Sequence, residues 1–173
     1  MTADPSSRRK PLANPPAANL RLDHRGRWLQ DGEEITHPRI LRALHRGIRR
    51  EASGEYSVQI GWQKAIVQVD ECPYFVRSLE FVVGELPALT LSDGSEERLD
   101  PSTLNLARED ALFCRVKGNA HTARFLPAAM MQFGDRTEER GDDLVFISGR
   151  GEYPIRQGIS NDDEEPGEGT DDD

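Results

Sequence analysis

One order of short elements occurs twice along this chain, and this repetition restricts the possible folds more than any other feature of the sequence. In each half, two strands, a helix and two further strands follow one another. Pro38 and Pro127 begin the two helices and Gly54 and Gly141 stop them, with offsets of 87 to 89 residues. A nearly constant offset indicates an internal duplication, although two unrelated antiparallel units could show the same order.

The first half is predicted from three stretches. Residues 20–29, LRLDHRGRWL, alternate apolar and polar side chains about Gly26, which is typical of a short hairpin. Residues 37–52 are expected to form an amphipathic helix. Residues 56–69 are expected to form two strands on either side of Gly61. The outer face of the helix is basic and carries Arg39, Arg42, His45, Arg46, Arg49 and Arg50.

The second half repeats this order. Residues 112–125 predict a hairpin around Gly118-Asn119, residues 127–141 a helix, and residues 144–155 a second hairpin. Residues 74–83 and 87–91 supply two more strand candidates between the halves. The sequence therefore predicts an α+β fold built from a duplicated β-β-α-β-β unit, with mostly antiparallel sheets and two main helices.

Charge and turn composition divide the chain into five expected segments. The last sixteen residues hold eight acids and no Lys or Arg, so they account for most of the net charge of −9. We expect a disordered N-terminal segment at 1–19, a first α+β unit with its connecting strand at 20–83, a linker strand and polar loop at 84–111, a second α+β unit at 112–157, and a disordered acidic tail at 158–173.

The sequence offers no membrane span and no secretion signal. The longest apolar stretch, around FVVGELPALTL, contains Glu85 and Pro87 and is shorter than the roughly 20 residues that a spanning helix needs. The basic residues 8–10 are followed by prolines and not by an apolar segment. We therefore expect a soluble, cytoplasmic protein.

Metal, cofactor and catalytic motifs are not found in the sequence. The four histidines, His24, His37, His45 and His121, show no ligand spacing, and no nucleophile, phosphate-loop or dinucleotide motif is present. Cys72 and Cys114 are expected to be small core residues, and a redox-sensing pair is the alternative. We expect no metal, no cofactor and no catalytic residues, although an enzyme whose groups converge only in three dimensions stays open.

Four stretches together resemble an uncharacterised bacterial family known as domain of unknown function 1285. They are LRLDHRGRWLQDGEEITHPRILRAL, GEYSVQIGWQKAIVQVDECPYF, ARFLPAAMMQF and LVFISGRGEYPI, and the likeness covers residues 20–157. The resemblance implies a duplicated α+β core whose C-terminal half superficially resembles pleckstrin-homology-like folds. It also implies a ligand site for a nucleotide-based compound between the halves, and a role in signal transduction or stress response.

The stretch IVQVDECPYF, residues 66–75, lies where the two halves should meet. Pro73 cannot donate to a central strand ladder, so the chain is expected to turn between Val69 and Tyr74. Its acids either cap a solvated corner or accept hydrogen bonds from a ligand. By analogy with the family, we predict a ligand site of Trp62, Lys64, Asp70, Glu71, Tyr74, Arg150 and Tyr153, with acids for hydroxyls, basic groups for phosphate and aromatic rings for stacking.

The basic helix face has two interpretations. It is either a solvated surface or a site for an anionic partner, such as nucleic acid, a membrane surface or the acidic tail of this chain. The sequence pI of about 5.0 and the few aromatic residues argue against nucleic acid.

Two functional hypotheses follow. The first is a non-enzymatic ligand-sensing or regulatory protein that binds a small, nucleotide-like molecule between its halves. The alternative is a protein-interaction module that uses a sheet edge or the basic face of helix 37–52. A closed pocket at the interface favours the first, and a flat interface with an exposed apolar or basic patch favours the second. The sequence does not indicate the oligomeric state.

Overall fold

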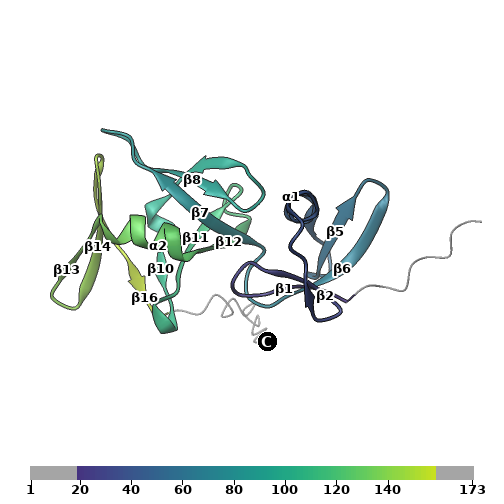
Figure 1. Ribbon diagram of the computed structural model, residues 1–173. Helices are drawn as coiled ribbons and strands as arrows, with labels where there is room; N and C mark the ends of the chain where they lie inside the picture. Colours follow the sequence, from purple (N-terminus) through teal and green to yellow (C-terminus); the bar gives the residue numbers. More distant parts are fainter. Residues whose placement is uncertain (1–18, 159–173) are drawn as a thin grey trace, which may run out of the picture.

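The computed structural model describes residues 19–158. The predictions of disorder for the N-terminal segment and the acidic tail therefore fall almost wholly outside the described residues. Within them the chain forms three sheets and two α-helices, as the α+β prediction requires. A six-stranded sheet lies at one end, a seven-stranded sheet in the middle and a three-stranded sheet at the other end (Figure 1).

The first sheet has the strand order β3-β2-β1-β6-β5-β4. Its strands are β1 (Leu20–Leu22), β2 (Trp28–Gln30), β3 (Glu33–Glu34), β4 (Ile48–Arg50), β5 (Tyr56–Ile60) and β6 (Gln63–Val69), with α1 (Pro38–Gly47) between β3 and β4. The predicted hairpin turn is confirmed, because Leu22 pairs with Trp28 and Gly26 has a φ of +77°. β6 pairs with β1 in parallel, and this pairing joins strands β1–β3 and strands β4–β6 into one sheet.

The second sheet has the order β16-β10-β11-β12-β7-β8-β9. Its strands are β7 (Tyr74–Glu80), β8 (Ala88–Leu91), β9 (Glu96–Arg98), β10 (Asn105–Leu106), β11 (Leu112–Val116), β12 (His121–Phe125) and β16 (Arg156–Gln157). Two short 3-10 helices, η1 (Pro101–Thr103) and η2 (Arg108–Asp110), flank β10. Most neighbouring strands are antiparallel, but β7 pairs with β12 in parallel and so does β10 with β16.

The third sheet has the order β13-β14-β15 and joins the second through α2 (Pro127–Gly134). Its strands are β13 (Thr137–Arg140), β14 (Asp143–Ser148) and β15 (Gly151–Pro154). Phe133 of α2 lies 5.4 Å from the ring of Phe125 on β12 and stacks at 4.7 Å on Phe146 of β14. These rings anchor the small sheet to the body of the molecule.

Both predicted helices are too long, and they fail in the same way. Residues 48–50 and 137–140 were expected to be helical, but they form β4 and β13. α1 ends at Gly47 because this residue packs against β5 so closely that a Cβ would lie 2.4 Å from the carbonyl oxygen of Gln59. Each half therefore contains a hairpin, a helix and a three-stranded antiparallel meander, and the first half also has the short strand β3 beside β2.

The middle of the chain is also more structured than predicted. Residues 74–83 were assigned to the first unit, but β7 lies inside the second sheet between β12 and β8. Residues 84–111 were expected to be a linker strand and a polar loop. They contribute β8, β9 and β10 and four fully buried leucines, Leu89, Leu91, Leu99 and Leu104. These leucines belong to the hydrophobic core of the protein.

One continuous hydrophobic cluster runs through both halves. Trp28 and Leu44 represent the first half in it, and Phe75 and Phe125 the second. The β1–β2 turn touches the second sheet directly, because a Cβ on Gly26 would lie 3.2 Å from the ring of Phe75. The two halves therefore pack on each other through shared apolar surface and not only through the connection at residues 70–73.

Candidate functional site

The residues predicted to bind a ligand lie at three separate places. Trp62 and Lys64 belong to the β5–β6 hairpin, Asp70, Glu71 and Tyr74 to the passage from β6 to β7, and Arg150 and Tyr153 to the third sheet. Because the β5–β6 hairpin and the third sheet lie toward opposite ends of the molecule (Figure 1), these residues do not form one site. Only Tyr74 lies within the side-chain cluster described below.

The acids of the connecting corner are engaged by neighbouring strands. The Asp70 carboxylate accepts hydrogen bonds from Arg21 Nε at 2.8 Å and Arg21 Nη2 at 2.7 Å. Glu71 Oε2 accepts from Arg124 Nη1 at 2.5 Å. β6 ends at Val69 and β7 begins at Tyr74, as predicted. The two acids thus fasten the corner to β1 and β12 through paired charges.

The other predicted residues have partners far from the corner. Lys64 Nζ lies 2.8 Å from Glu51 Oε1, and the same carboxylate accepts from Ser57 Oγ. Arg150 Nε donates to the carbonyl oxygen of Gly84 at 3.3 Å. The Tyr153 ring lies 6.5 Å from that of Phe146. Trp62 differs from all of these, since it is 85% exposed beside the β5–β6 turn.

Three rings meet where the first sheet faces the second. His121 begins β12, and its ring centroid lies 5.3 Å from that of Tyr74 on β7. The same imidazole lies 6.5 Å from the ring of Tyr56 on β5. Tyr74 is buried, whereas Tyr56 and His121 are half-buried and keep part of their surface in solvent. The three rings therefore form a surface to which both halves contribute.

Three cations surround these rings. Lys117 Nζ lies 5.3 Å from the centroid of the Tyr74 ring and 2.8 Å from Asp93 Oδ2. Arg115 Nη1 donates to Thr122 Oγ1, and its Nη2 to the carbonyl oxygen of Asn119, both at 3.0 Å. The Arg50 side chain has no hydrogen bond or ion pair within residues 19–158. We call the six residues Arg50, Tyr56, Tyr74, Arg115, Lys117 and His121 the junction cluster.

The cluster keeps its histidine neutral. Burial of the ring, followed by the positive charges of Arg50, Arg115 and Lys117, lowers the pKa of His121 below its usual 6.5. Its Nδ1 atom is buried and has no hydrogen-bond partner in the described part of the chain. A neutral imidazole with a free ring nitrogen can take one further hydrogen bond there, as donor or acceptor according to the tautomer.

The basic helix face is arranged differently from the prediction. His45 turns inward, where its Nδ1 accepts from Trp28 Nε1 at 3.3 Å and its ring meets the buried indole edge-on. Arg49 and Arg50 belong to β4 and not to the helix. Arg46 stays on α1 and its Nε donates to the carbonyl oxygen of Asp93 at 3.4 Å. α1 therefore contacts the β8–β9 turn of the second half.

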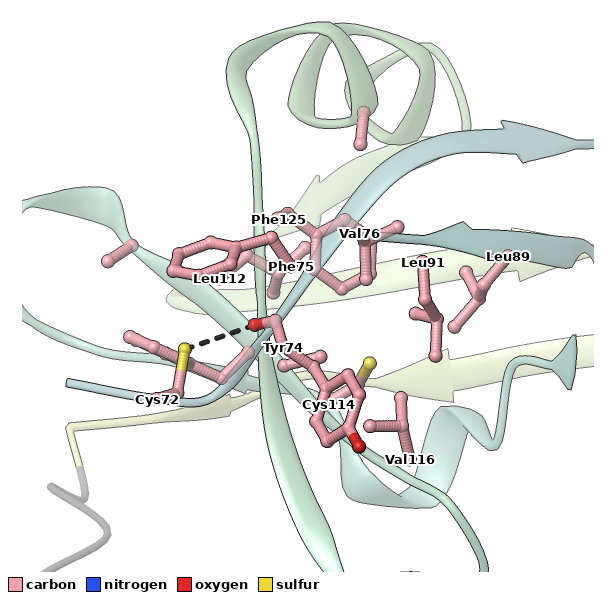
Figure 2. Packing of buried hydrophobic residues seen from close by; sticks show 14 of the residues in the cluster. Cys72, Tyr74, Phe75, Val76, Leu89, Leu91, Leu112, Cys114, Val116 and Phe125 are labelled. Carbon is pink, nitrogen blue, oxygen red and sulfur yellow. Dashed lines mark hydrogen bonds between the residues drawn. The ribbon is translucent and has the colours of Figure 1, made fainter. Parts of the chain in front are cut away.

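Both cysteines lie in the core, as expected, and are shielded from solvent. Cys72 Sγ donates to the carbonyl oxygen of Tyr74 at 3.2 Å, and Figure 2 shows the sulfur atom of Cys114 apart from that of Cys72, beside the Tyr74 side chain. Burial raises the pKa of the Cys72 thiol to about 12 and raises that of Cys114 as well. Thiols with raised pKa values are poor nucleophiles, so the structure gives the redox-sensing alternative no support.

The best-formed hollows of the described residues do not lie between the halves. One, of about 180 Å³, is lined by residues 81–85 with Arg136, Ser148 and Gly149. The other, of about 290 Å³, lies beside Arg98 and Arg150. The junction cluster is thus an open surface and not an enclosed cavity. Within residues 19–158 no group of acidic, His and Cys side chains is placed to hold a metal ion, and no helix is long and apolar enough to cross a membrane.

Sequence reasoning found Tyr74 but missed the other members of the junction cluster. The sequence pattern places Arg50 on the helix and predicts for Tyr56 only a position in a strand. Arg115, Lys117 and His121 lie far from them in sequence and come close only when β12 pairs with β7. The available signal was the density of cations in the KGNAH turn and its flanks, next to a lone histidine.

Comparison with known proteins gives two similar structures. No protein-family model matches the sequence, and no curated relative was found. A DUF1285 family protein from Silicibacter pomeroyi DSS-3 superposes with a TM-score of 0.63 at 17% identity, over 83% of this chain and 84% of that chain. A DUF1285 family protein from Shewanella baltica OS155 gives a TM-score of 0.54 at 16% identity, over 68% and 91%. The resemblance noted in the sequence is confirmed at the level of the fold: the chain has the fold of DUF1285 family proteins.

Proposed function

We propose that this chain is a non-enzymatic regulatory protein that binds a small, anionic, nucleotide-like molecule on the junction cluster. The observation that supports this most is the meeting of Tyr56, Tyr74 and His121 among three cations. Tyr74 is buried, so the half-buried rings of Tyr56 and His121 are the ones that would stack on a base, while guanidinium groups bind phosphate oxygens at two points. The site differs from the one predicted from sequence in every residue except Tyr74.

The three cations of the junction cluster would contribute unequally to phosphate binding. Lys117 already pairs with Asp93 and Ser95, so little of its hydrogen-bonding capacity is left. Arg50 and Arg115 have no carboxylate within 4.0 Å among the described residues, and they are the groups we assign to phosphate. His121 would contribute the part of its ring that reaches solvent, because its Nδ1 atom is buried. Recognition on an open surface favours a charged ligand over an apolar one.

The cellular role is proposed by resemblance. DUF1285-like sequences imply a part in signal transduction or stress response, and a ligand sensor in the cytoplasm would suit that role. The sequence motifs of an enzyme are lacking, which is why we propose binding and not catalysis.

Native mass spectrometry of the full chain, followed by thermal shifts with nucleoside mono-, di- and triphosphates, tests the proposal. Free nucleosides serve as the control for the phosphate. We expect a stabilisation that rises with nucleotide concentration and is weaker with nucleosides. Loss of one charged hydrogen bond costs about 1.5–3 kcal/mol, so Arg115→Ala should weaken binding by about tenfold or more.

Arg150→Ala is the matched control, since it removes the same charge from the third sheet. Equal affinities for nucleotide and nucleoside, or equal losses in both variants, would contradict the proposal.

We also infer that the two halves are copies of one unit. Each begins with a hairpin, continues with a helix that starts at proline, and ends with a three-stranded meander. The meanders differ in their attachment, because β6 joins β1 while the β13–β15 sheet stays separate. The likeness of the second half to pleckstrin-homology domains stays a prediction.

A protein-interaction module is the second candidate, and two observations favour it: the best-formed hollows lie away from the interface between the halves, and the β5–β6 hairpin is exposed. Trp62 is 85% exposed, and Ile66 and Ile60 on the same hairpin are 57% and 42% exposed. The register places Ile60 and Ile66 on opposite faces of the hairpin, so the exposed Trp62 at its turn is the residue that argues for a contact surface. Affinity purification with wild-type protein and with Trp62→Ser tests this candidate. It requires a defined partner that the wild type retains and the variant loses, while Arg150→Ala retains it.

A further inference from the structure

The cations of this protein divide into two groups by their neighbours. Seven of them in residues 19–158, Arg21, Arg27, Lys64, Arg98, Lys117, Arg124 and Arg140, lie within 4.0 Å of a carboxylate. The other described arginines have no such partner, and half of them lie on α1, on β4 and on β11 of the second sheet. These are Arg39, Arg42, Arg46, Arg49, Arg50 and Arg115, which we call the arginine surface.

The arginine surface has two parts, because Arg49 and Arg50 point to opposite faces of β4: Arg49 turns back to the Arg46 carbonyl oxygen, whereas Arg50 lies opposite Tyr56. Arg39, Arg42 and Arg46 follow a three- and four-residue spacing along one side of α1, and the chain passes directly into β4 with Arg49 and Arg50. The positive charges of Arg50 and Arg115 both lower the pKa of His121, so both lie near its ring. Arg50 comes from β4 of the first sheet and Arg115 from β11 of the second. Six like charges without counter-charges repel one another, so an anionic occupant would stabilise the folded protein.

We infer that the acidic C-terminal segment, residues 159–173, is that occupant and docks on the arginine surface of its own chain. The segment carries eight acids and no Lys or Arg. Its charge is opposite to that of the surface and similar in number. The docking needs only these charges, whereas its regulatory meaning rests on the proposed function, because two of the six arginines belong to the junction cluster.

The end of the described chain lies close enough for this contact. The Gly158 amide donates to the carbonyl oxygen of Leu106, which is opposite Leu112 on β11, three residues before Arg115. The spacing from β16 to β10, the spacing from β10 to β11 and the three-residue rise from Leu112 to Arg115 together put Arg115 about 15 Å from Gly158. Fifteen residues treated as a random coil would have a root-mean-square span of about 20 Å. The acids would therefore be within reach of Arg115 at an effective concentration on the order of millimolar.

Docking would make the segment a competitor of the anionic ligand. Each exposed ion pair contributes little, about 0–1 kcal/mol, so the contact is an exchange among many weak pairs and is sensitive to salt. A nucleotide that binds Arg50 and Arg115 would displace the segment. Deletion of residues 159–173 would then raise nucleotide affinity without changing the residues of the site.

Paramagnetic relaxation on the full chain tests the docking without any ligand. A nitroxide attached to Thr170→Cys labels the segment alone, because Cys72 and Cys114 are buried. At low salt we expect selective loss of amide signal intensity at Arg50, Arg115 and His121, and no loss in β13 or β14. The intensities should return at about 1 M salt, where the screening length falls to about 3 Å.

The double variant Arg50→Ser/Arg115→Ser should reduce the losses at His121, and Arg25→Ser/Arg150→Ser, which removes two arginines outside the surface, should not. Intensity losses that are absent, uniform over the molecule, or unchanged by salt and by the first variant would overturn the inference. Nucleotide binding is measured separately, so a docked segment with no nucleotide affinity would refute only the proposed function. An undocked segment with intact affinity would refute only the docking.

Discussion

The ring of Tyr56, from the first sheet, lies 6.5 Å from that of His121, from the second. Neither half alone could make this contact, because β5 and β12 belong to different sheets. The nearby Arg50 comes from the first sheet and Arg115 from the second. The surface we assign to ligand binding therefore exists only when the halves are packed together, and any change in their packing would alter it.

Acid should destabilise the protein through His45. Burial, together with the charge of Arg77, lowers the pKa of His45 from 6.5 to about 4 in the folded protein. Between these values the unfolded chain binds more protons, so the free energy of unfolding is greatest above pH 6.5 and falls as the pH drops toward 4. We expect a loss on the order of 2 kcal/mol over this range, measured by denaturant unfolding at several pH values.

His45→Gln should flatten that profile, because glutamine can accept from Trp28 Nε1 without titrating. His121 titrates in the same direction, so some dependence will remain. The exposed His24, changed to Gln, is the control for removing a histidine that lies outside the core. A wild-type protein with constant stability from pH 7 to 4 would refute the structural role of the Trp28–His45 hydrogen bond.

Two glycines at helix ends should respond oppositely to alanine. A Cβ on Gly47 would meet the backbone of Gln59 at 2.4 Å, so Gly47→Ala should lower the free energy of unfolding by about 1–3 kcal/mol. Gly134, at the end of α2, has nothing within 4 Å of the same position. Gly134→Ala should be neutral or stabilise by up to about 1 kcal/mol. Equal effects of the two changes in thermal unfolding would show that α1 does not end against β5.

The two thiols should not react with thiol reagents in the native protein. Burial raises the pKa of both cysteines, to about 12 for Cys72, so almost no thiolate is present at neutral pH. An aromatic disulfide reagent should therefore react with two thiols in denaturant and with neither in the folded state. Fast reaction of either native thiol would reopen the redox interpretation of this pair.

The hairpins of this fold were predictable because their turns depend on local chemistry. Gly26, Gly61 and Gly118 adopt positive φ angles and lie between strands that alternate in polarity, and their three hairpins form, as does the fourth predicted hairpin, β14–β15. The passage from Val69 to Tyr74 was predictable as well, since Pro73 excludes a continuous strand.

The helix ends and the site were not predictable in the same way. Ile48 to Arg50 continue the helical pattern of the sequence, and only the packing of Gly47 on β5 converts them to a strand. His45 looks like part of a polar face until the Trp28 indole is placed beneath it. The junction cluster depends on the parallel pairing of β7 with β12, which brings together residues that no short-range pattern connects.

The measurement that tests the central claim most directly is a nuclear magnetic resonance titration of the full chain with adenosine triphosphate, read at the His121 imidazole and at the amides of residues 50, 56, 74 and 115. We predict saturable shifts confined to these residues, and their loss in Arg115→Ala but not in Arg150→Ala. Unchanged signals at His121 up to millimolar nucleotide, or shifts that centre on the third sheet, would contradict the assignment of the junction cluster as the ligand site.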